Sequence, residues 1–161
     1  MEERSTAPMG LDLTRIRRGE ITAAVGALLV LLGLFVTPWY ETHGATFEAL
    51  GRPDGTVPAS FGAWGGAGWL GTIGDLVILA AAVFAIAALI FGARGIEVDG
   101  RGNWLLGLSV AAVVVVVLRI IITPTSLSGY EFNSDLRLGI FVTLAGVLVL
   151  AWGAWRRRLP S

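Results

Sequence analysis

Four apolar stretches, each near the length of a membrane crossing, constrain this chain more than any other feature. A helix needs about 20 largely apolar residues to cross a bilayer, and such stretches occur at about 21–38, 72–91, 104–123 and 138–155. Backbone groups in lipid must be hydrogen-bonded within their own segment, so these stretches can only be helices. The sequence therefore predicts an all-α membrane protein, a bundle of four antiparallel transmembrane helices.

The composition agrees with that class of protein. Hydrophobic residues make up 55% of the chain and charged residues only 15%, whereas roughly 25% of residues are charged in soluble domains. The net charge is zero, which indicates no attraction to nucleic acid. The chain contains no cysteine, which excludes disulfides, thiolate catalysis and cysteine metal sites.

Arginine supplies every basic residue and gives the direction of the helices. Basic residues are enriched in cytoplasmic loops. Here they cluster before the first span, between the second and third, and after the fourth, at Arg15, Arg17, Arg18, Arg94, Arg101, Arg156, Arg157 and Arg158. In loops 39–71 and 124–137 acidic residues outnumber arginines. We therefore expect both termini in the cytoplasm and these two loops outside.

The start of the chain allows two interpretations. Residues 1–13 contain few residues that pack and are predicted to be a disordered cytoplasmic tail, followed by one membrane domain over 14–158. The first apolar stretch also has the basic-then-apolar order of a signal peptide. The residues after it, TPWYETHGA, lack a clean cleavage site, so we interpret the stretch as a retained helix.

Tryptophans lie near the ends of the predicted spans. Trp39 and Trp69 are expected at the outer membrane interface, and Trp104 and Trp155 at the inner one. Trp64 lies in the glycine-rich segment ASFGAWGGAGWLG and is also predicted to anchor the chain at the membrane surface. The alternative is that this outer segment is a docking surface for a lipid or a partner.

Glycines recur at seven-residue spacing in the first and last spans. Gly26 and Gly33 lie in the first, and Gly139 and Gly146 in the fourth. This spacing keeps one helix face toward a neighbour, and small residues let membrane helices approach closely. We predict that these glycines form a packing seam between the first and last helices. Chance is the alternative in a chain with 22 glycines.

One arginine interrupts the apolar run VVVVVLRIIITP. Arg119 would lie about 6 Å below the outer end of its helix, and Asp75 about 5 Å below the same surface on the neighbouring helix. Intramembrane charges usually pair with one another, so we predict an ion pair between these two residues. Two alternatives are that Arg119 extends its head group to the surface, or that the pair is a site for a transported ion or proton.

No catalytic, cofactor or metal site is predicted. His43 is the only histidine and has no second histidine or cysteine with which to bind a metal. The segment GTIGD offers one intramembrane aspartate, whereas aspartyl proteases need two. The serines of SLSGY lack a histidine partner, and the glycine-rich GAWGGAGWLG does not follow a strand as a phosphate-binding loop would.

Several of these residues together resemble a group of proteins. They are TPWY at 37–40, Gly68 and Trp69 before Asp75, LRI near the end of the third span, and LRLGIFVTLAGVLVLAWGAW in the fourth. The pattern resembles uncharacterised small four-helix integral membrane proteins of actinobacteria. The resemblance implies a multi-pass protein of the bacterial plasma membrane and brings no activity with it.

The predicted function follows from plentiful packing seams and absent catalytic groups. We expect a non-enzymatic integral membrane protein, an accessory or structural subunit whose partner is another membrane protein or a further copy of this chain. One alternative is a small transporter or channel component that uses Asp75 and Arg119. Another is a lipid or partner sensor that uses the first outer loop.

Overall fold

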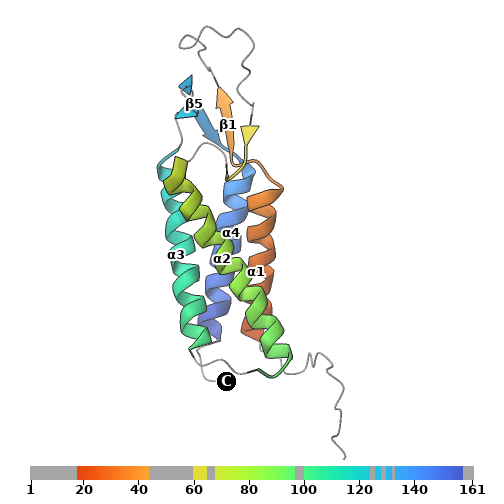
Figure 1. Ribbon diagram of the computed structural model, residues 1–161. Helices are drawn as coiled ribbons and strands as arrows, with labels where there is room; N and C mark the ends of the chain where they lie inside the picture. Colours follow the sequence, from red (N-terminus) through yellow and green to blue (C-terminus); the bar gives the residue numbers. More distant parts are fainter. Residues whose placement is uncertain are drawn as a thin grey trace, which may run out of the picture.

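The computed structural model describes residues 18–43, 60–64, 68–96, 100–123, 126–127, 130–131 and 133–157. These form four helices, α1 (Arg18–Phe35), α2 (Gly68–Ala93), α3 (Arg101–Ile121) and α4 (Leu138–Arg156). Successive helices run in opposite directions in one elongated bundle (Figure 1). All four are long and apolar enough to cross a membrane, which confirms the prediction of a bundle of four candidate spans. The predicted tail, residues 1–13, lies outside the described residues.

Among the helix ends that differ from the predicted ones, two have a proline or a glycine close to them. The first span was expected to reach residue 38, but α1 ends at Phe35. Pro38 has no N–H to donate and disfavours helical backbone in the residue before it. The last turn closes with the Thr37 hydroxyl donating to the Gly33 carbonyl at 3.3 Å. At the start of α3, Gly100 has a φ of 73°, a left-handed conformation that glycine adopts easily.

A small sheet at one end of the bundle was not predicted. Strands β1 (Tyr40–His43), β2 (Ser60–Phe61) and β5 (Asn133–Leu136) form it in the order β2-β1-β5, with both pairs antiparallel. A separate antiparallel pair joins β3 (Ser126–Leu127) and β4 (Tyr130–Glu131). The segments predicted only as outer loops therefore contain strands, and β1 and β5 continue directly from α1 and into α4 (Figure 1).

The sheet has one apolar and one polar face. Glu41 lies opposite Ser60 and Asp135 in the register, and Tyr40 lies opposite Leu136. Side chains alternate between faces along a strand, so these two groups point in opposite directions. Tyr40 is fully buried and Leu136 packs against the core. The apolar face therefore covers the end of the bundle, and the charged face is turned away from it.

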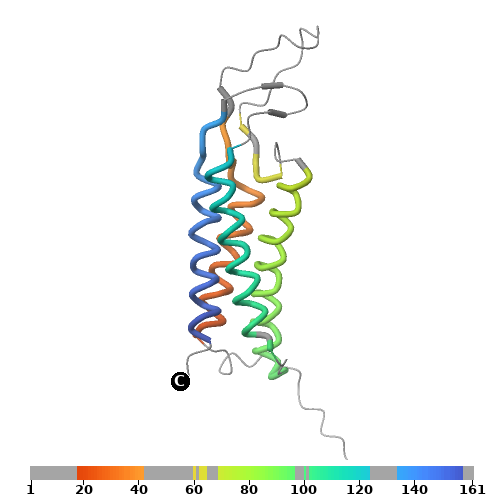
Figure 2. Tube along the Cα trace, turned by 90° about the vertical axis from the view of Figure 1, so that its left-hand side faces the viewer, coloured from red at the N-terminus to blue at the C-terminus, as the bar shows by residue number. Residues whose placement is uncertain are grey.

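Around the bundle, α1 contacts α4 and α2, and α3 contacts the same two helices. Figure 2 shows α1 and α4 side by side along their length. Their contact is lined by the predicted glycines. A Cβ atom added to Gly26 would lie 2.5 Å from the Leu150 nitrogen, and one added to Gly146 would lie 2.7 Å from the Val30 nitrogen.

The other two predicted packing glycines lie in the same seam, nearer to the sheet. A Cβ atom added to Gly33 would lie 2.9 Å from the Thr143 nitrogen, and one added to Gly139 would lie 2.5 Å from the Pro38 carbonyl oxygen. Real Cβ atoms do not approach other atoms below 3.0 Å. The two helix backbones are therefore in direct contact, and any side chain at these four positions requires them to separate.

This geometry predicts that Gly26→Ala and Gly146→Ala each destabilise the protein. Overpacking a close contact costs about 1–3 kcal/mol, and the clash here is with backbone that cannot rotate away. The measurement is thermal unfolding in detergent. Gly107→Ala is the matched control, because nothing lies within 4 Å of a Cβ atom added there. Equal melting temperatures for the seam variants and the control would contradict the predicted packing role.

Candidate functional site

The structure brings Arg119 and Asp75 together. Arg119 lies in the last turn of α3, and its Nη2 atom donates to Asp75 Oδ2 on α2 at 2.7 Å. The two side chains are 10% and 0% exposed. The guanidinium therefore points into the bundle, which contradicts the alternative in which Arg119 extends to the surface.

Arg119 also holds two segments that lie outside the helices. The same Nη2 atom donates to the carbonyl of Ala63 at 3.2 Å, just after β2. The guanidinium carbon lies 5.9 Å from the centre of the Trp39 ring, a distance at which a cation is attracted to an aromatic face. One side chain on α3 thus contacts α2, the segment after β2 and the segment between α1 and β1.

Trp39 and Tyr40 close the site toward the sheet. Trp39 is fully buried and donates from Nε1 to the Gly33 carbonyl at 2.7 Å. The expectation that Trp39 anchors the chain by facing the membrane interface is therefore wrong, because its indole is bonded inside the protein. The Tyr40 hydroxyl donates to the Arg119 carbonyl at 3.3 Å. Burial raises the pKa of Tyr40, which keeps this hydroxyl protonated as a donor.

Two polar atoms of the ion pair between Asp75 and Arg119 make no hydrogen bond within the described part of the chain. Asp75 Oδ1 and Arg119 Nε are buried and have no hydrogen-bond partner among the described residues. A buried polar atom without a partner is costly, and in native proteins such atoms accompany local strain, a functional role, or a bound water or ion. A purely structural ion pair does not need these two unbonded atoms, Asp75 Oδ1 and Arg119 Nε.

A second buried ion pair lies at the opposite end of the bundle. Arg157, just after α4, places Nη2 3.3 Å from Oε1 of Glu20 in the first turn of α1, and these side chains are 14% and 3% exposed. Sequence reasoning missed this pair. The predicted seam between the first and last helices was the one available signal, and in the structure the seam extends to residue 19, which lies next to residues 153 and 157.

The remaining predicted aromatic anchors are exposed. Trp69 is 73% exposed at the start of α2, and Trp104 and Trp155 are 68% and 57% exposed near the other end of the bundle. Trp64 is 38% exposed, and its ring centre lies 5.8 Å from that of Phe35. These four indoles therefore lie on the surface of the described structure, whereas that of Trp39 does not.

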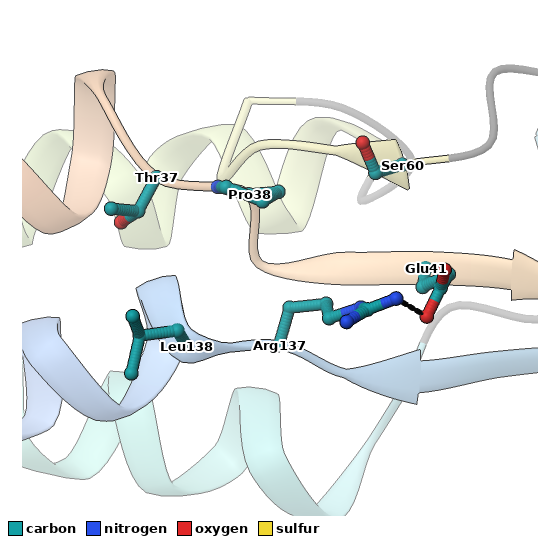
Figure 3. Close-up of a pocket in the computed structure, with 6 residues that line it drawn as sticks. All are labelled: Thr37, Pro38, Glu41, Ser60, Arg137 and Leu138. Carbon is teal, nitrogen blue, oxygen red and sulfur yellow. Dashed lines mark ion pairs between the residues drawn. The ribbon is translucent and has the colours of Figure 1, made fainter.

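A groove of about 410 Å³ lies beside the sheet, where α1 leads into β1 and β5 leads into α4. It is lined by Thr37, Pro38, Glu41, Ser60, Arg137 and Leu138. Arg137 and Glu41 point toward one another across the two strands and form an ion pair (Figure 3). The pair is half-exposed, unlike the pair inside the bundle.

The described residues contain no group of three His, Cys, Asp or Glu side chains that could hold a metal. His43 lies in β1, opposite Asn133.

No protein-family model, curated protein or solved structure matches the chain.

The burial of Arg119 and Asp75 predicts strong energetic coupling between them. Removing one partner of a buried pair costs about 3–5 kcal/mol in soluble cores, because it leaves an uncompensated charge. Arg119→Leu and Asp75→Leu should therefore each lower the melting temperature in detergent, and the double variant should recover much of the loss. Recovery should be incomplete, since Arg119 also donates to Ala63.

The pair Glu41 and Arg137 provides the matched control for this double-mutant cycle. Exposed pairs are worth about 0–1 kcal/mol, so Glu41→Ala and Arg137→Ala should show little coupling. Additive effects of the two changes at Asp75 and Arg119 would contradict the inference that their contact stabilises the bundle.

Proposed function

We propose that the protein is a non-enzymatic integral membrane protein that acts as an accessory or structural subunit of a membrane complex. The observation that carries this proposal is the set of partners of Arg119. Its guanidinium is engaged by Asp75, the Ala63 carbonyl and the Trp39 ring, all within the protein. A charge held in this way braces the outer end of the bundle and is not presented to a substrate.

The proposed placement has both termini in the cytoplasm and the sheet outside, in the bacterial plasma membrane. The first residues of α1 and the last of α4 lie at one end of the bundle, opposite the sheet (Figure 1). Arg18, Arg94, Arg156 and Arg157 lie at or near that end, and basic residues favour the cytoplasmic side.

A small transporter or channel component is the second candidate function. The spare Asp75 Oδ1 atom favours it, because intramembrane carboxylates commonly carry protons or bind ions. A sensor that acts through the first outer loop is the third. The exposed indoles of Trp64 and Trp69 support it, although residues 44–59 of that loop lie outside the described residues.

The proposed orientation predicts the labelling of single cysteines. The chain has no cysteine of its own, so each introduced thiol is the only one. Ser60→Cys, on the sheet, should react with a membrane-impermeant reagent on intact cells. Asn103→Cys, exposed in the first turn of α3, should react only after the cells are permeabilised. The opposite pattern would establish the inverted orientation.

The proposed accessory role predicts where the bundle contacts another protein. Photoreactive residues are introduced at Leu28, Val83, Val114 and Leu148, one exposed position on each helix. We expect protein adducts, to a second copy or another membrane protein, from one helix or two adjoining helices and not from the others. Adducts to lipid alone at all four positions would contradict the accessory role.

Reconstitution separates this role from transport. Liposomes that contain the purified protein should show no proton flux above that of empty liposomes under an imposed gradient. Flux that is present in the natural protein and lost in Asp75→Asn would replace the accessory role with the transporter.

A further inference from the structure

The groove beside the sheet combines two surfaces of different character. Thr37, Pro38 and Leu138 form its side toward the helices, and Glu41, Ser60 and Arg137 form its side toward the sheet. Figure 3 shows the Arg137 guanidinium directed along the strands to the Glu41 carboxylate, with Ser60 on the neighbouring strand β2. A cation, an anion and a hydroxyl therefore lie together above an apolar floor.

The groove lies where the apolar exterior of the bundle ends. Val36 and Leu138 are 69% and 67% exposed, and Phe35 and Phe141 are 60% and 49% exposed. These side chains come from the outermost turns of α1 and α4 and the residue that follows α1. The charged residues follow within a few positions along the chain. If the apolar exterior faces lipid, the groove is at the depth of the phospholipid head groups.

We propose that this groove binds the head group of a phospholipid with a primary ammonium, phosphoethanolamine. The lipid phosphate accepts hydrogen bonds from Arg137, and the ammonium donates to the Glu41 carboxylate and the Ser60 hydroxyl. The acyl chains continue past Leu138 along the outside of α1 and α4. The volume of about 410 Å³ falls in the range of about 300–1,000 Å³ that is usual for small-molecule sites.

Charge complementarity selects this head group over the other common ones. The residues that line the groove present one cation and one anion, and a ligand that carries one of each matches them. An anionic lipid such as phosphatidylglycerol would place its phosphate near Glu41 with no ammonium to offset the repulsion. Phosphatidylcholine carries both charges, but its quaternary ammonium has no N–H to donate to Glu41.

The protein side of the site has the hydrogen-bonding capacity for this ligand. Arg137 carries five N–H donors, more than its contact with Glu41 uses, and a carboxylate offers about four acceptor positions. The Arg137 side chain is 48% exposed, which leaves it accessible from the lipid. The inference rests on the membrane placement proposed above but not on the accessory role.

The test is lipid retention by the purified full chain, measured by native mass spectrometry. The protein is mixed with equal amounts of phosphatidylethanolamine, phosphatidylcholine and phosphatidylglycerol of matched acyl chains. The natural protein should retain phosphatidylethanolamine preferentially. Glu41→Gln should lower that preference by about tenfold, the loss expected for one charge-assisted hydrogen bond. Arg137→Gln should lower the retention of all three lipids, because each of them carries the phosphate that Arg137 would bind.

Asp135→Asn is the matched control, because Asp135 lies opposite Glu41 on the same sheet face but does not line the groove. It should lower the preference much less than Glu41→Gln does, because it does not contact the ligand directly. Ser60→Ala, which removes a hydroxyl that accepts from the ammonium, should also lower the preference. Four outcomes would each overturn the proposal. They are equal retention of the three lipids, preferential retention of phosphatidylglycerol, an equal loss in Asp135→Asn, and competition by water-soluble glycerophosphoethanolamine at the lipid's own concentration. A failure of the membrane placement would instead appear in the cysteine labelling.

Discussion

The sheet end of this protein depends on one constraint, which is that the guanidinium of Arg119, buried in an apolar bundle, must find partners within the protein. Removing an ion from water is costly unless other groups replace the lost hydration. Arg119 draws those groups from Asp75 on α2, from the Ala63 carbonyl after β2 and from the Trp39 ring before β1. Three segments that are distant in the sequence are thereby fixed relative to α3. The position of the sheet on the bundle follows from this set of contacts.

The glycine seam supplies the second constraint. Because α1 and α4 touch through backbone at Gly33 and Gly139, the chain leaving α1 and the chain entering α4 emerge side by side. Arg137 N donates to the Trp39 carbonyl at 2.8 Å, and β1 pairs with β5 directly beyond this bond. Close helix packing thus places two very short strands in register. The same junction, with Glu41 on β1 and Arg137 between β5 and α4, forms the groove.

The sequence allowed the helices and the depths of Asp75 and Arg119 to be predicted, because hydropathy and the rise per residue are local properties. It did not reveal the sheet. Strands of two to four residues carry too little alternation to be recognised, and β1 and β5 meet only because α1 and α4 do. Hydropathy also gives the depth of a residue but not its direction, which is why Trp39 was assigned to the membrane surface. The ion pair between Glu20 and Arg157 could be predicted only by first assuming that α1 and α4 pack along the glycine seam.

The placement of the other buried polar groups bears on whether the two ion pairs could act together. Apart from the two ion pairs and from Trp39 and Tyr40 at the sheet end, the buried polar side chains among the described residues are Ser109 and Thr143. The Ser109 hydroxyl donates to the Leu105 carbonyl at 2.7 Å, and that of Thr143 donates to the Gly139 carbonyl at 2.9 Å. Each hydroxyl is thus bonded within its own helix.

The bundle between the two ion pairs is otherwise lined by apolar residues such as Val30, Ile78, Ala81 and Ala85. A charge passing between Asp75 and Glu20 would lose its hydration with nothing to replace it. The two pairs are therefore best understood as separate braces, one at each end of the bundle.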